Sequence, residues 1–189
     1  AVGTGAPDYY FARLLQEAFG ARIQMVVGYT GTGDINLAIE RGEVQCRAGT
    51  ISTIFGREPM RTWVKTGFIR VLAQGGLKRD PRLPDVPTIH ELMDKYKLPD
   101  QTRRVVKVAQ SAGEIGRPVV GPPGIPADRV RVLREAFDKV MNDPALLADA
   151  TKAGWELKPV SGEKLQAIAN EVIAQPPEVI EGLKKVLGI

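Results

Sequence analysis

The first fifty residues alternate between glycine-rich loops, helical patterns and short apolar runs, and this alternation constrains the fold more than any other feature. A helical pattern runs from Pro7 to a stop at Gly20, and a second one runs from 34 to 42. Each is followed by a short apolar run, at 22–29 and at 43–49. Alternating helices and buried strands are typical of α/β proteins with parallel strands. With 189 residues, of which 43% are apolar, the chain can form one medium domain or two small lobes.

The remainder of the chain continues this pattern and then becomes mostly helical. Thr88 and Glu91 have the spacing of a capping box and predict a helix start, after a loop rich in proline and charge. A break near residue 117 is the expected lobe boundary. Further strands are expected at 68–75, 117–124 and 155–160. Further helices are expected as two short pieces within 50–67, broken near Gly56 and Pro59, and at 89–96, 101–116, from 126 through Val140, and at 144–154, 162–173 and 176–188.

Two of the loops repeat the same tripeptide, Gly-Thr-Gly, and an aspartate follows each tripeptide within three residues. "VGTGAPD" covers residues 2–8 and "GYTGTGD" covers 28–34. Ligands of open α/β sheets bind where strands lead into helix N-termini, whose free N–H groups favour anions. Glycine lets the backbone approach a ligand closely, and threonine adds a hydroxyl. The two loops are therefore candidates for gripping carboxylate or phosphate oxygens, the alternative being that they are only tight turns.

Nucleotide binding and catalysis find little support in the residues. A dinucleotide fingerprint needs a third glycine where Asp8 and Asn36 stand, and neither loop has the lysine of a P-loop. His90, the only histidine, is expected on a helix surface, and Cys46, the only cysteine, in the core of a strand. No group of side chains has metal-ligand spacing. We expect no enzyme activity, catalytic residue, metal or cofactor; an enzyme domain for a phosphorylated substrate or nucleotide is the alternative.

The charges predict an ordinary solvated surface. The 26 basic and 22 acidic residues are interspersed and leave a net charge of +4, so no nucleic-acid partner is expected. Docking of a basic surface onto a membrane protein or a nucleic acid is a third interpretation. Five arginines near the loops are expected on solvated faces, with anion steering as the alternative: Arg22, Arg41, Arg47, Arg57 and Arg61. No apolar run approaches the roughly 20 residues of a membrane span.

Three stretches resemble one family over nearly the whole chain: "GYTGTGDINLAIERGEVQCRAGT", "DPRLPDVPTIHELM" and the run from 117 to 168. They are similar to the substrate-binding receptors of tripartite tricarboxylate transporters. The resemblance implies a two-lobed, hinged periplasmic binding protein of type II. Such a protein would capture a small organic acid and deliver it to membrane permease subunits. Its ligand-binding residues would be Gly3, Thr4, Gly5, Ala6, Pro7, Tyr29, Thr30, Gly31, Thr32, Gly33, Asp34, Gly49 and Thr50.

The resemblance also implies how the chain divides between lobes. Residues 1–116 would form the second, ligand-binding lobe, and 117–189 would be the C-terminal helical part of the first. Members of the family have about one further lobe of chain before the position of residue 1, including a secretion signal. Helices that cover a sheet in that lobe are therefore expected to expose apolar faces. "AGTIST" at 48–53 stands where many relatives carry a tryptophan- and serine-rich stretch. The identity of the carboxylate and the oligomeric state do not follow from the sequence.

Overall fold

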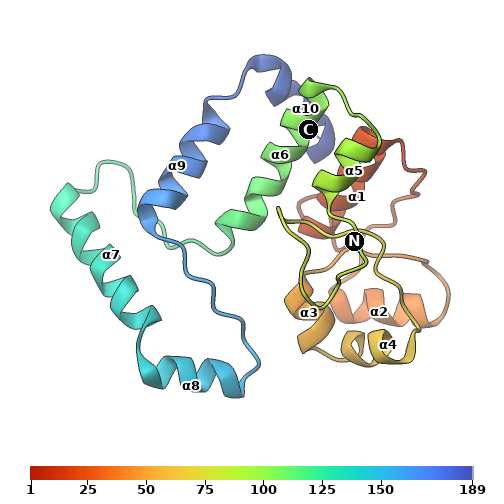
Figure 1. Ribbon diagram of the computed structural model, residues 1–189, viewed down its shortest axis with the longest axis horizontal. Coiled ribbons are helices and arrows are strands. Elements are labelled where there is room, and N and C mark those ends of the chain that lie inside the picture. Colours follow the sequence, from red (N-terminus) through yellow and green to blue (C-terminus); the bar gives the residue numbers. More distant parts are fainter. Residues whose placement is uncertain (189) are drawn as a thin grey trace. The chain divides into compact units, whose positions relative to one another are not determined.

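The computed structural model describes residues 1–188, and these residues form ten α-helices (Figure 1). The helices fall where the sequence predicts them, including the two short pieces after residue 50. Their bounds are α1 Pro7–Phe19, α2 Thr32–Glu40, α3 Ile51–Gly56, α4 Met60–Thr66, α5 Ile89–Lys95, α6 Asp100–Ile115, α7 Ala127–Met141, α8 Pro144–Lys152, α9 Gly162–Ile173 and α10 Pro177–Leu187.

Local sequence signals account for where several of these helices begin and end. Pro7 occupies the first position of α1, and Gly20 ends that helix with φ of 66°, a conformation that favours glycine. The predicted capping box is present at α5, where the Thr88 side chain accepts from the Glu91 N–H and Glu91 bonds back to the Thr88 N–H. Ser161 caps α9, because its hydroxyl accepts a hydrogen bond from the Lys164 N–H.

The predicted strands differ from the structure, so the expected α/β sheet is not confirmed. Among residues 1–188, the β pairing consists of one isolated parallel bridge between Gln74 and Thr88. A strand is stable only when its backbone groups pair with a neighbour, and apolar periodicity reports side-chain burial rather than pairing. Side chains that a sheet would cover are accordingly exposed, including Val26, Val27 and Leu72. The five segments concerned are 22–29, 43–49, 68–75, 117–124 and 155–160.

The chain divides into two compact units, which differ from the predicted lobes. The first unit contains Ala1–Gly113 and the segment from Gln175 onward, and the second contains Glu114–Ala174. The first break lies close to the expected boundary near residue 117. Helix α10, however, belongs to the first unit, whereas the sequence groups it with residues 117–189. The assignment of lobes therefore stays a prediction.

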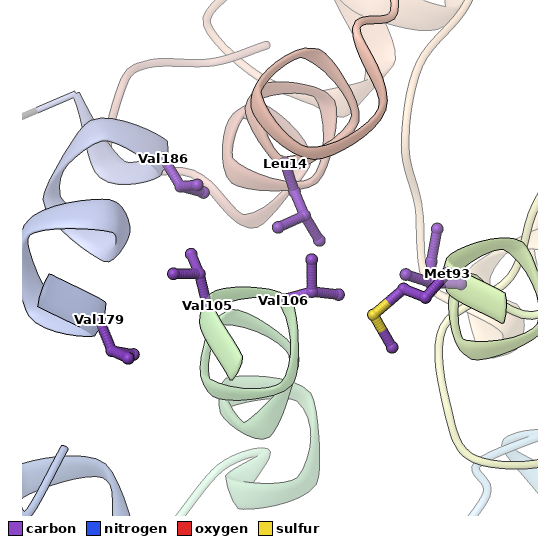
Figure 2. Close-up of a cluster of buried hydrophobic side chains, with 7 residues drawn as sticks. Leu14, Met93, Val105, Val106, Val179 and Val186 are labelled. Carbon is purple, nitrogen blue, oxygen red and sulfur yellow. The ribbon is translucent and has the colours of Figure 1, made fainter. Parts of the chain in front are cut away.

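Four helices build the main core of the first unit (Figure 2). Leu14 of α1 and Val106 of α6 are almost completely buried, and Val179 and Val186 bring α10 onto the same cluster. Ile89, Met93 and Val105 complete it. A second cluster joins Ile54 of α3 to Met60 and Trp63 of α4. Burial of this kind stabilises a fold by about 25 cal/mol per Å² of apolar surface.

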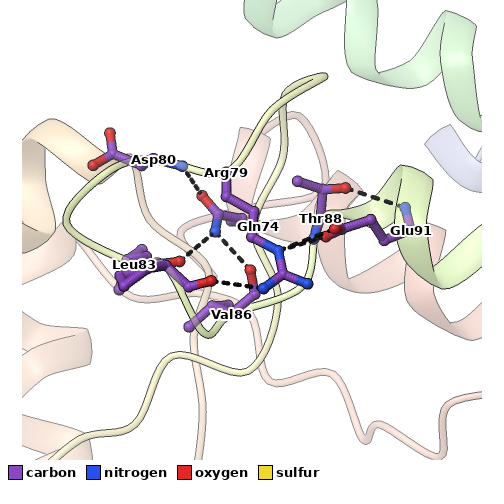
Figure 3. A network of polar contacts seen from close by, with 8 residues as sticks. Gln74, Arg79, Asp80, Leu83, Val86, Thr88 and Glu91 are labelled. Carbon is purple, nitrogen blue, oxygen red and sulfur yellow. Dashed lines mark hydrogen bonds and ion pairs between the residues drawn. The ribbon is translucent and has the colours of Figure 1, made fainter.

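The proline-rich loop before α5 is folded around one buried glutamine (Figure 3). The Gln74 amide nitrogen donates to the carbonyls of Leu83, at 3.0 Å, and Val86, at 2.7 Å, while its oxygen accepts from the Asp80 N–H at 2.8 Å. Arg79 closes the outer side through both Glu91 carboxylate oxygens. The hydrogen bond from Arg79 and that from the Thr88 backbone lower the pKa of Glu91.

The second unit has much less core. Ala150 is the one buried apolar side chain among its described residues, and neither α7 nor α9 buries any residue. Leu133 and Val140 of α7 are more than half exposed. An ion pair of 2.7 Å between Arg134 and Glu163 links α7 to the start of α9.

Candidate functional site

The first glycine loop leads directly into α1 and presents an open backbone. Thr4, Gly5 and Pro7 are exposed, while Gly3 and Ala6 are half-buried. The Ala6 N–H donates to the Gly3 carbonyl at 3.2 Å and closes the turn. The Tyr10 hydroxyl points back at this loop, because a Cβ built on Gly5 would lie 3.8 Å from it.

The second glycine loop begins beside the first. The Gly28 N–H donates to the Val2 carbonyl at 3.2 Å, and the N-terminal amine of Ala1 donates to the Val26 carbonyl at 2.7 Å. Gly28 has φ of 100°, which a residue with a side chain would rarely adopt. The structure therefore brings the entrances of the two loops together. Beyond them, Tyr29 and Gly31 are half-buried, and the exposed members are Thr30, Thr32, Gly33 and Asp34.

The two helices that follow these loops begin without a side-chain cap. Ala6 and Gly31 occupy the N-cap positions of α1 and α2, and neither helix start receives a side-chain hydrogen bond. In contrast, Thr50, Thr88, Asp143 and Ser161 cap α3, α5, α8 and α9. The first-turn N–H groups of α2 have no intrahelical partner and remain available to an anion. In the first turn of α1 only the Asp8 N–H remains, because Pro7 has no N–H and the N–H groups of Ala6 and Tyr9 donate to backbone carbonyls.

Arg47 connects the second glycine loop to the segment that contains the predicted ligand-binding residues Gly49 and Thr50. Its Nη1 donates to Asn36 Oδ1 at 2.7 Å and to the Thr32 carbonyl at 3.3 Å, and its Nε donates to the Ala48 carbonyl at 3.1 Å. Partial burial lowers the pKa of the Arg47 guanidinium, and the Asp8 carboxylate of α1 opposes that shift. An arginine stays charged at any physiological pH. A positive charge held in one orientation therefore lies near the start of α1, the second glycine loop and Gly49.

Gly49 and Thr50 lie next to this charge and differ in what they offer. A Cβ on Gly49 would be 3.9 Å from Arg47 Nη2, so Gly49 keeps the backbone open beside the guanidinium. The Thr50 hydroxyl is engaged in capping α3, since it accepts from the Thr53 N–H at 3.2 Å. It also lies 3.0 Å from Ser52 Oγ and 2.8 Å from Thr53 Oγ1. Thr50 thus orders the start of α3 in this structure.

The residues considered for other chemistry lie elsewhere. Cys46 is exposed, which corrects its expected place in a strand core, and His90 lies half-buried in the first turn of α5. Within residues 1–188, no group of three or more histidine, cysteine or acidic side chains is arranged to hold a metal.

A cavity of about 570 Å³ lies in the second unit. Two arginines face three carboxylates there, so it does not favour an anion: Arg131, Arg134, Glu135, Asp138 and Glu163.

Sequence reasoning missed Asn36 and Tyr10, which the structure places at the loops. In the sequence, Asn36 stands out only as the position where a dinucleotide fingerprint needs glycine, whereas its contact with Arg47 and the approach of Tyr10 to Gly5 are visible only in the structure. Spacing holds a signal for Asn36, because it lies four residues after Thr32 on the same helix face. The contact of Arg47 with Asn36 joins residues 11 apart in sequence and has no local signature.

Paired glycine loops with uncapped helix starts and a fixed guanidinium define a candidate anion-binding site, the kind of site expected of a solute-binding protein. The family model described as "Tripartite tricarboxylate transporter family receptor" matches residues 1–184. The chain therefore belongs to this receptor family and is a solute-binding protein of it. No curated protein and no solved structure shows significant similarity to the chain.

Membership of the family establishes the broad role. Receptors of this family are periplasmic and have a periplasmic binding protein fold. They bind a small ligand and function together with membrane transporter subunits. The family serves transport rather than catalysis. In the described part of the chain, no helix is both long and apolar enough to cross a membrane.

Proposed function

We propose that this protein captures a small carboxylate-containing metabolite in the periplasm and delivers it to the permease of a tripartite tricarboxylate-type transporter. The ligand carboxylate binds at the two glycine loops, through residues 3–7 and 29–34, together with Gly49 and Thr50. Residues 1–116 act as the ligand-binding lobe of a two-lobed α/β receptor, and 117–189 contribute to the other lobe. Family membership supports this role, but it leaves open which acid is bound.

The hydrogen bond between the Gly28 N–H and the Val2 carbonyl is the observation that most supports the location. It sets the entrances of both loops side by side, and each loop then leads into a helix without a side-chain cap. The free N–H groups at the start of α2, together with the exposed glycine backbone of the first loop, favour a ligand with negatively charged oxygens. The exposed Thr4, Thr30 and Thr32 add hydroxyl donors around them.

Calorimetric titration of the full chain tests the proposal. The panel contains dicarboxylates, tricarboxylates and amino acids, with inorganic phosphate and a nucleotide as comparison ligands. We expect at least one carboxylate to bind, to raise the unfolding temperature, and to bind more tightly than phosphate. Stabilisation by phosphate compounds alone would contradict the proposal and favour a site for phosphorylated ligands. Absence of binding across the whole panel would also overturn it.

A further inference from the structure

The Arg47 guanidinium is held in one orientation and keeps part of its donor capacity. A guanidinium has five N–H donors. Three of them are used, one from Nε to the Ala48 carbonyl and two from Nη1 to Thr32 and Asn36. The two N–H donors of Nη2 have no acceptor in the described part of the chain. An arginine fixed on one side and free on the other is preorganised for a ligand, because little side-chain entropy remains to be lost.

The free side of the guanidinium faces an open part of the candidate site. Nη2 lies beside Gly49, which is exposed and carries no side chain to fill the space. Nη1 meanwhile bonds to the carbonyl of Thr32, the first residue of α2. The free N–H groups of that helix start and the free Nη2 therefore belong to neighbouring parts of the chain. Both attract negative charge.

We propose that Arg47 is the residue that recognises the charge of the ligand, with Nη2 donating to a ligand carboxylate, and that Asn36 is its positioning residue. This inference rests on the proposed function and gives the site a charged side-chain contact in addition to backbone groups. Hydrogen bonds from a guanidinium to a carboxylate are stronger than those between neutral groups. Asn36 acts through Arg47, because its Oδ1 makes the shortest of the contacts that hold the guanidinium.

The proposal also predicts a substitution, at Asp8, that should increase the affinity for a carboxylate. The Asp8 carboxylate interacts electrostatically with Arg47 from the first turn of α1, without a direct ion pair. The negative charge reduces the attraction that an incoming anion feels at the guanidinium. Replacing Asp8 with asparagine should therefore strengthen carboxylate binding by about twofold to fivefold. A gain in affinity cannot arise from a folding defect.

The experiment is calorimetric titration of full-length variants with the carboxylate that binds best to the wild type. We expect Arg47→Met to weaken binding at least tenfold and Arg47→Lys to weaken it less, because lysine keeps the charge without the planar fork. Arg104→Met is the matched control, since Arg104 is exposed on α6 of the same unit. Its affinity should equal that of the wild type.

A double-mutant cycle separates positioning from a merely structural role. Asn36→Ala should weaken binding in the wild-type background and have little further effect in Arg47→Met. Wild-type affinity in Arg47→Met would overturn the inference while leaving the proposed function intact, even if that variant is less stable. Weaker binding in Asp8→Asn, or tighter binding of inorganic phosphate than of any carboxylate, would also overturn it. A wild-type protein that binds no acid would overturn both proposals.

Discussion

Gln74 shows how a single buried amide can organise a long loop. Its side chain, 3% exposed, satisfies two carbonyls and one N–H of a loop whose three prolines and many charges predict only an extended surface segment. The carbonyls of this loop need a side-chain donor, because its prolines have no N–H group to donate to them. Polarity and proline content predict the existence of such a loop, but not the residue around which it folds.

Replacing Gln74 with leucine should destabilise the protein by about 2–3 kcal/mol, because three hydrogen bonds of a buried amide are lost and the Leu83 carbonyl keeps only the Val86 N–H. Urea unfolding of the full chain measures the change. Gln45→Leu is the matched control: Gln45 is exposed and makes one hydrogen bond, to the Gly42 carbonyl at 3.2 Å. Its effect should stay within about 0.5 kcal/mol. Equal losses in the two variants would contradict the role assigned to Gln74.

At the scale of elements, helices could be predicted from sequence and sheet structure could not. Pro7, Gly20, Thr88 and Ser161 act through contacts within a few residues, so their signals are complete in the local sequence. Strand pairing depends on partners distant in sequence, and an apolar run does not indicate which segment its partner is. The candidate site divides in the same way. The glycine loops are visible as a motif, whereas Arg47 acquires its place only through contacts with other segments.

Helix packing gives a second prediction, at Gly182 in α10. A Cβ on this residue would lie 2.6 Å from Val105 Cγ2 of α6, which is closer than side chains pack. Gly182→Ala should therefore lower the free energy of unfolding by about 1–2 kcal/mol. The steric overlap in the core destabilises the fold by more than the higher helix propensity of alanine stabilises it. Thermal and urea unfolding give the change. Gly113→Ala, in α6 with nothing within 4 Å of its Cβ, should be neutral or stabilising. A stabilised Gly182→Ala would show that α6 and α10 do not approach this closely.

Over the whole molecule, apolar burial is distributed unequally between the two units. The first unit has two clusters of buried side chains, and the second has Ala150 alone among its described residues. Hydrophobic burial is the dominant favourable term in folding, so the second unit has little of its own to offset chain entropy. Its helices present apolar residues to solvent, among them Leu133, Val140 and Ile173.

The units should consequently unfold at different denaturant concentrations. Amide hydrogen exchange, resolved by peptide, should show α7 and α9 exchanging well before α1, α6 and α10 as urea is raised, since local stability follows buried apolar contact. The two tryptophans give an independent measurement, because Trp63 lies in the first unit at 6% exposure and Trp155 in the second at 62%. In Trp155→Phe, the fluorescence of Trp63 should follow the later transition, that of α1 and α6. A single transition with equal protection in α6 and α7 would mean that the second unit draws its stability from contacts beyond its own core.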